Sequence, residues 1–163
     1  DYSQPAYQPS RHVRGHFAQE KNKLWGVLLR SPPGIAFELK NEGAIIDWVL
    51  NTIEEEGSSL KRITYAFCSD EYLYEVNMKY LNHNTYTDII TFPMSYEPIE
   101  SDIFISIDRV RENAESFETS FQLELYRVIS HGLLHFMGYE DHEEEDKILM
   151  RSKEDLYLSK ITF

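Results

Sequence analysis

Cysteine and long apolar runs are what this sequence most clearly lacks. Cys68 is the only cysteine among 163 residues, which excludes an intramolecular disulfide framework. No apolar run approaches the roughly 18–20 residues that a bilayer span requires. The polar N-terminus, rich in Tyr, Gln and Ser, is not typical of a secretory signal. Together these absences favour a cytoplasmic protein that makes no contact with a membrane.

Basic residues are also scarce. The chain has 16 Lys and Arg against 28 Asp and Glu, which gives a formal net charge of −12. This balance argues against broad, non-specific binding to DNA or RNA, because the phosphate backbone is itself negative. It does not exclude an enzyme that acts on a nucleic acid through a local basic patch. One candidate for such a patch is a groove formed by Lys61, Arg62, Arg109, Arg111 and Arg127.

The first part of the chain lacks sustained hydrophobic periodicity. Residues 1–34 contain Pro5, Pro9 and the run Ser31-Pro32-Pro33-Gly34. We expect this segment to be a loose arm or a non-native extension. The folded domain is then expected to span residues 35–163, a length that suits one domain with its own core.

Within that domain, two periodicities alternate. Period-two alternation and β-branched residues predict four strands, at residues 35–39, 62–67, 88–92 and 102–106, the third stopped by Pro93. Helical spacing predicts one helix over residues 45–53, before Gly57, and a second from Ser69 to about Tyr80. Three further helical segments follow the last strand. This order predicts an α+β fold, a small mixed four-stranded sheet covered by about five helices.

The most informative segment is His131-Gly132-Leu133-Leu134-His135, which Gly138, Asp141 and His142 follow. Residues four apart lie on the same face of a helix, so both imidazoles can reach one point. Imidazole is the commonest metal ligand among side chains. Two ligands from a helix and one from the next turn describe a catalytic metal site with an open position. We therefore predict a metal site at the end of this helix.

The helix that carries the pair is expected to be buried. Thr119 and Gln122 fit a capping box at its start, and apolar residues surround most of its axis. A polar stripe remains, consisting of Glu124, Arg127, His131 and His135. A buried imidazole pair without a partner is unfavourable, so a metal or a hydrogen-bonded group must accompany it. We expect Arg127 to bind an acidic neighbour such as Glu124.

Two residues compete as the third ligand. Asp141 lies six residues after His135, but together with Glu144 it also fits a capping box for the last helix. His142 is the alternative ligand. Gly132 occupies the position where zinc proteases of the His-Glu-x-x-His type have their general base, which disfavours a peptidase. A glycine there permits close approach by a neighbouring backbone or a substrate.

These residues resemble the signature of the YbeY family of bacterial endoribonucleases and ribosomal RNA maturation factors. The similarity covers about residues 35–160 in matching order and spacing. Its blocks are His131–His135 with Gly138-Tyr139, Tyr80–His83 with Thr87–Pro93, and Asp102–Ser106. The family often has an arginine where this chain has Leu81, so Arg109, Arg111 or Arg127 is expected to replace it in phosphate binding.

The resemblance implies a zinc-dependent endoribonuclease that acts on single-stranded RNA, not on DNA. It implies a role in maturation of the 16S ribosomal RNA 3′ end and in ribosome quality control, with the small subunit as partner. It places ligands on His131 and His135, and a third on the register of Asp141 or on His142 through a shifted loop. We expect one zinc ion per chain and hydrolysis by a metal-activated water.

Two alternatives remain open at this stage. The first keeps the metal and changes the substrate to peptides or small esters. The second is a ribosome-assembly factor whose zinc is structural, in a closed site that uses both Asp141 and His142.

Overall fold

The computed structural model describes residues 26–30, 37, 39–83 and 86–161. Its strands are β1 (Gly26–Arg30), β2 (Leu60–Cys68), β3 (Ile89–Tyr96) and β4 (Ile99–Ser106). Its helices are α2 (Glu42–Glu55), α3 (Asp70–Leu81), α4 (Ile107–Ser116), α5 (Phe121–Phe136) and α6 (Glu144–Leu158). The order of elements confirms the predicted α+β fold. No helix in these ranges has the length and apolar character needed to cross a membrane.

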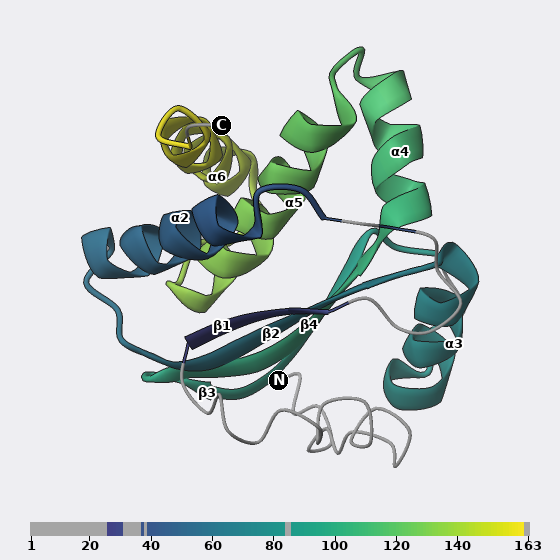
Figure 1. Ribbon diagram of the computed structural model, residues 1–163, viewed down its shortest axis with the longest axis horizontal. Coiled ribbons are helices and arrows are strands. Elements are labelled where there is room, and N and C mark those ends of the chain that lie inside the picture. Colours follow the sequence, from purple (N-terminus) through teal and green to yellow (C-terminus); the bar gives the residue numbers. More distant parts are fainter. Residues whose placement is uncertain (1–25, 31–36, 38, 84–85, 162–163) are drawn as a thin grey trace.

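The four strands form one mixed sheet in the order β1-β2-β4-β3. The first three strands in that order run parallel, and β3 pairs with β4 in the antiparallel direction. Figure 1 shows α2, α5 and α6 above the sheet and α3 below one of its ends. The strand β3 is therefore an edge of the sheet, and α5 lies close to it.

Both faces of the sheet are covered because side chains alternate along each strand. Ile63, Tyr65 and Phe67 of β2 belong to the large core shared with α2, α5 and α6. Ala66 and Cys68 belong to a smaller core shared with α3. Burial raises the pKa of the Cys68 thiol to about 12, so this residue behaves as a small apolar side chain.

The position of the first strand corrects the sequence prediction. The strand expected at residues 35–39 is replaced by β1, Gly26–Arg30, which pairs in parallel with β2 and buries Val27 and Leu29. Phe37 and Leu39 are outside regular secondary structure, and residues 35, 36 and 38 are outside the described part. A continuous apolar run suits a parallel strand better than a segment interrupted by a charge. Part of the expected arm thus belongs to the sheet, while the nature of residues 1–25 stays a prediction.

Pro93 does not end β3 as the sequence predicts. The strand continues to Tyr96, and its register against β4 shifts between Pro93 and Ser95. A proline donates no hydrogen bond to a neighbouring strand, and an edge strand tolerates this loss. The bulge at this point lets β3 extend alongside α5.

Candidate metal centre

The helix α5 positions both histidines, and it is buried as predicted. Ser120 caps it, because its hydroxyl accepts a hydrogen bond from the Leu123 backbone at 3.1 Å. The predicted cap at Thr119 is therefore one residue too early. Side chains from Glu124 to Phe136 are buried around most of the axis, which fixes the helix rigidly against the sheet.

His131 and His135 lie one turn apart on α5, and their rings meet edge to face at an interplanar angle of 85°. Their Nε2 atoms are 3.0 Å apart. The Asp141 Oδ2 atom lies 3.2 Å from Nε2 of His131 and 3.6 Å from Nε2 of His135. Two ring nitrogens at this separation repel each other unless a proton or a cation lies between them. The two imidazoles and the carboxylate form a donor set that zinc accepts, so the residues present fit such an ion.

Asp141 does not cap α6, which was the alternative to its role as a metal ligand. The helix α6 begins at Glu144, its cap is Glu143, and the Glu143 backbone donates a hydrogen bond to Asp146 at 3.4 Å. The alternative role of Asp141 as this cap is therefore excluded, because the acidic run offers a cap two residues later. Asp141 is left to face the histidines.

His142 is exposed and lies outside the ligand cluster. Within the described ranges, His131, His135 and Asp141 form the one group of three potential ligands whose donor atoms all lie within 4.8 Å of one another. The arrangement therefore favours Asp141 over His142.

The imidazole of His131 is held from behind by α6. Its Nδ1 atom lies 2.7 Å from Oε2 of Glu154, a buried carboxylate whose other oxygen accepts a hydrogen bond from Arg127 at 3.0 Å. Arg127 also pairs with Asp155 at 2.8 Å. Arg127 therefore has the expected structural role, with acidic partners on α6 in place of Glu124.

The two histidines have pKa values that shift in opposite directions. The hydrogen bond to Glu154 raises the pKa of His131, outweighing the opposing effect of burial. Burial and the neighbouring His131 charge lower the pKa of His135. The lowered pKa favours a neutral His135, the protonation state that a metal ligand requires, whereas the raised pKa of His131 means that a bound cation must displace a proton there.

The loop between α5 and α6 is anchored to a distant helix. The Tyr139 hydroxyl donates a hydrogen bond to Oε2 of Glu56, the residue after α2, at 2.9 Å. Lys153 and Tyr157 of α6 also donate hydrogen bonds to Glu56. Tyr139 is two residues before Asp141, so this network restricts the segment that carries the carboxylate ligand.

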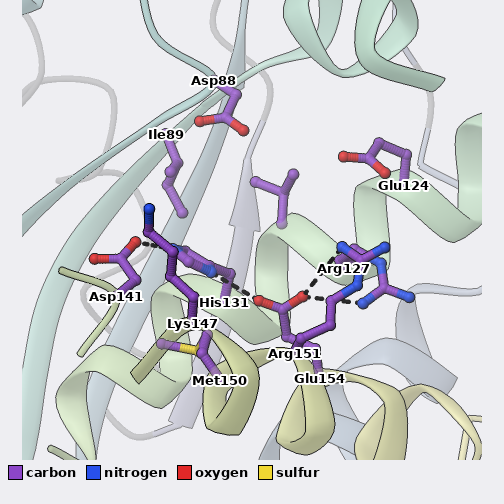
Figure 2. Close-up of a pocket in the computed structure, with 11 residues that line it drawn as sticks. Asp88, Ile89, Glu124, Arg127, His131, Asp141, Lys147, Met150, Arg151 and Glu154 are labelled. Atoms are coloured by element: carbon purple, nitrogen blue, oxygen red, sulfur yellow. Dashed lines mark hydrogen bonds and ion pairs between the residues drawn. The ribbon is translucent and has the colours of Figure 1, made fainter. Parts of the chain in front are cut away.

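A cavity of about 390 Å³ opens beside the ligands, between α5, α6 and the start of β3. Figure 2 shows His131 and Asp141 at one end and Arg127 and Glu124 at the other. The residues that line it are Asp88, Ile89, Glu124, Arg127, Val128, His131, Asp141, Lys147, Met150, Arg151 and Glu154. The site thus combines candidate ligands with a concave surface that holds charges of both signs.

Asp88 and Glu124 are cavity residues that the sequence alone does not identify as part of the site. Burial raises the pKa of both carboxyl groups. Two sequence signals point to them: Asp88 is the first residue of a predicted strand, and Glu124 belongs to the same polar stripe as His131. Carboxyl groups with raised pKa values in a cavity are typical of proton-transfer sites.

The predicted basic groove does not form. Four of its five cations bind partners elsewhere: Lys61 pairs with Glu100, Arg62 with Asp102 and Arg109 with Asp70, and Arg111 lies over the Phe121 ring. Of the five cations proposed from the sequence, only Arg127 lines the cavity. Lys147 and Arg151, which the sequence does not single out, line it instead.

The sequence of this chain is similar to those of known proteins. A family model described as Endoribonuclease YbeY matches residues 35–162. A relative from Flavobacterium psychrophilum, named Endoribonuclease YbeY, is 51% identical over 74% of this chain and 87% of its own length. A relative of the same name from Amoebophilus asiaticus is 43% identical over 76% of this chain and 86% of its own length.

A solved structure shows the same fold. The solution structure of TM1509 from Thermotoga maritima has a TM-score of 0.62 and 23% identity, and the match covers 83% of this chain and 88% of that one. At this identity the likeness bears on the fold alone. The family match and the curated relatives establish more: the chain belongs to the Endoribonuclease YbeY family.

Proposed function

We propose that this protein is a zinc-dependent endoribonuclease that cleaves single-stranded RNA, with the ion held by His131, His135 and Asp141. The observation that carries the proposal is the convergence of these donor atoms beside a cavity in a chain of this family. The names of the relatives supply the reaction class, and the chemistry of the donor set supplies the metal.

The residues of the site have separate roles in this proposal. When bound, zinc supplies Lewis acidity, which makes water more acidic and polarises a phosphoryl oxygen. Glu154 fixes the His131 ring in the tautomer that leaves Nε2 free to ligate. Asp88 and Glu124 are the candidate proton carriers, because each has a raised pKa and lines the same cavity.

The alternatives fit the site less well. A peptidase of the His-Glu-x-x-His type needs a carboxylate at position 132, and a Cβ atom there would lie 2.6 Å from Cδ1 of Ile89. A structural zinc site needs a fourth protein ligand, for which the sequence offers His142. That residue is exposed and outside the cluster, which supports a catalytic site with an open position.

Membership of the family supports a proposal for the cellular role. We propose that the enzyme acts in the cytoplasm on ribosomal RNA of the small subunit, in maturation of the 16S RNA 3′ end and in ribosome quality control. Incubation of purified immature small subunits with the protein, followed by mapping of RNA ends, tests the first part. Unchanged 3′ ends with an active enzyme would contradict it.

The decisive experiment measures metal content and RNA cleavage in parallel. Wild-type protein is expected to contain about one zinc ion per chain and to cleave a single-stranded RNA. The His131→Ala/His135→Ala variant is expected to lose both properties, whereas His83→Ala, which alters an exposed loop histidine, keeps them. A peptide and an ester substrate test the alternative reactions. Full RNA cleavage by the double variant would rule the proposed site out.

A further inference from the structure

Three cations line the cavity beside the metal centre, and two of them, Lys147 and Arg151, lie one turn apart on α6. The third, Arg127, is held by Glu154 and Asp155. We propose that Lys147 and Arg151 bind two phosphates of single-stranded RNA on the side of the scissile bond where the strand passes over α6. This inference rests on the proposed function and names the residues that hold its substrate.

Lys147 and Arg151 are available for such contacts. Both are exposed, and no ion pair within the described part of the chain involves Lys147. Arg151 approaches an acidic group only at 4.0 Å, to the Glu154 oxygen that Arg127 already contacts at 3.0 Å. By contrast, four of the five cations of the groove expected from the sequence, Lys61, Arg62, Arg109 and Arg111, are engaged elsewhere in the fold.

The placement of the two cations suits a strand that leaves the metal centre. Residues four apart on a helix have Cβ atoms about 5–6 Å apart on one face, so their charges can meet successive phosphates. In Figure 2, Lys147 extends past Asp141 at the metal end, and Arg151 lies beside Arg127 at the other end. The two charges therefore lie on either side of the His131–Glu154 pair.

The same side chains continue onto the outer surface of α6. Lys147 and Arg151 also line a shallow hollow of about 620 Å³ whose walls come from α6 alone. Ile148 lies in this hollow and is 63% exposed, which gives a base an apolar surface to pack against. The two cations thus form a ridge between the cavity and the hollow, and a strand bound to them crosses from one to the other.

The charge of the whole chain makes these contacts decisive. A net charge of −12 opposes the approach of RNA, and Glu144, Glu145 and Asp146 precede Lys147 directly. Binding must then come from local contacts at short range, because long-range attraction is absent. Removal of either cation is therefore expected to weaken binding more than the loss of one positive charge elsewhere.

The test uses the full chain with Lys147→Gln, Arg151→Gln and the double substitution. The matched control, Lys40→Gln/Lys79→Gln, removes the same charge at exposed positions outside the cavity. Fluorescence anisotropy with a short single-stranded RNA, in the presence of a chelator, measures binding without cleavage. The double variant is expected to bind about tenfold more weakly. A plot of the logarithm of the binding constant against the logarithm of the salt concentration has a negative slope. Its magnitude is expected to decrease by about 0.7 for each phosphate that the protein no longer neutralises.

Kinetics with the zinc-loaded protein give an independent readout. The KM for RNA is expected to rise about tenfold in the double variant, with kcat within about twofold of wild type. Turnover of bis(4-nitrophenyl) phosphate, which has no neighbouring phosphates, should be unchanged. Binding and kinetics equal to those of the control would overturn the inference, as would a fall in kcat at constant KM.

Failure of the two proposals is distinguishable. If wild-type protein neither binds nor cleaves RNA, the proposed function fails and this inference fails with it. If wild-type protein cleaves RNA and the double variant matches the control, only the role of Lys147 and Arg151 is refuted.

Discussion

The Glu154 carboxylate lies 2.7 Å from Nδ1 of His131, across the interface between α6 and α5. The carboxylate is buried, and its second oxygen is bound by Arg127. A metal-ligating histidine whose other nitrogen meets a carboxylate is fixed in orientation and becomes a stronger ligand. The candidate site therefore depends on a helix that supplies none of its three ligands.

The first prediction concerns this contact. Glu154→Gln keeps the shape of the side chain and removes its charge, so zinc affinity is expected to fall about 10–100-fold. Competition with a chromophoric chelator measures the affinity. Asp155→Asn is the control, since Asp155 pairs with Arg127 and makes no contact with His131. Equal affinities in the two variants would show that Glu154 does not support the site.

The third ligand is tested by a pair of substitutions. Asp141→Ala removes the carboxylate whose Oδ2 lies 3.2 Å from Nε2 of His131 and 3.6 Å from Nε2 of His135. We expect it to lower bound zinc and RNA cleavage by at least about tenfold. His142→Ala alters an exposed neighbour outside the cluster and is expected to leave both close to wild type. Metal analysis after dialysis gives the answer, and the reverse result would assign the ligand to His142.

The close approach of α5 to β3 leads to a third prediction. A Cβ atom at position 132 would lie 2.6 Å from Cδ1 of Ile89, so the end of the Ile89 side chain must shift to admit it. Gly132→Ala is therefore expected to lose most or all of the roughly 1 kcal/mol that alanine gains over glycine in a helix. Ile89→Val removes the obstructing atom. In that background, Gly132→Ala should be stabilising, because alanine favours a helix over glycine by about 1 kcal/mol. Urea unfolding of the four proteins measures the coupling, and additive effects would contradict it.

Glu56 gives a prediction that depends on pH. Burial raises its pKa, but hydrogen bonds from Tyr157, Tyr139 and Lys153 outweigh this effect and leave the pKa below the ordinary value of 4.5. A carboxylate with a lowered pKa stabilises the fold above its unfolded-state pKa, and the stabilisation is lost as pH falls through the folded-state value.

Glu56→Gln is therefore expected to reduce the free energy of unfolding by about 1–3 kcal/mol at neutral pH. This difference in unfolding free energy should shrink when the pH falls below the pKa of an ordinary carboxyl group. Denaturant unfolding of the metal-free proteins at neutral pH and at that lower pH measures the difference. Glu55→Gln, at an exposed neighbour paired with Lys160, serves as the control and should show a smaller effect. A difference that does not vary with pH would refute the charged role of Glu56.

Local patterns were enough to predict much of this fold. The alternation in β2 and β4 and the spacing of His131 and His135 are set by the period of one element, which a sequence displays directly. The start of α6 is less determined, because several residues of its acidic run can serve as a cap. The structure places the cap at Glu143, and this choice leaves Asp141 free.

Tertiary contacts account for what the sequence could not indicate. Glu56, Glu154 and Lys147 are ordinary charged residues in their local context. They become important because α2, α5 and α6 pack together in the fold. Residue spacing within one helix does not predict which helices pack against each other. The first strand is hidden for a different reason: the prolines at positions 32 and 33 favour a domain that begins after them, although the chain enters the sheet before them.

The course of β3 has a consequence for how the protein behaves at high concentration. This strand is an edge of the sheet, and unpaired edges are templates on which a second chain can add a strand. Pro93 has no backbone N–H to offer to a second chain, and the pairing register of β3 is irregular between Pro93 and Ser95. The residue that the sequence suggested as the end of β3 thus protects the sheet against intermolecular pairing and aggregation at this edge.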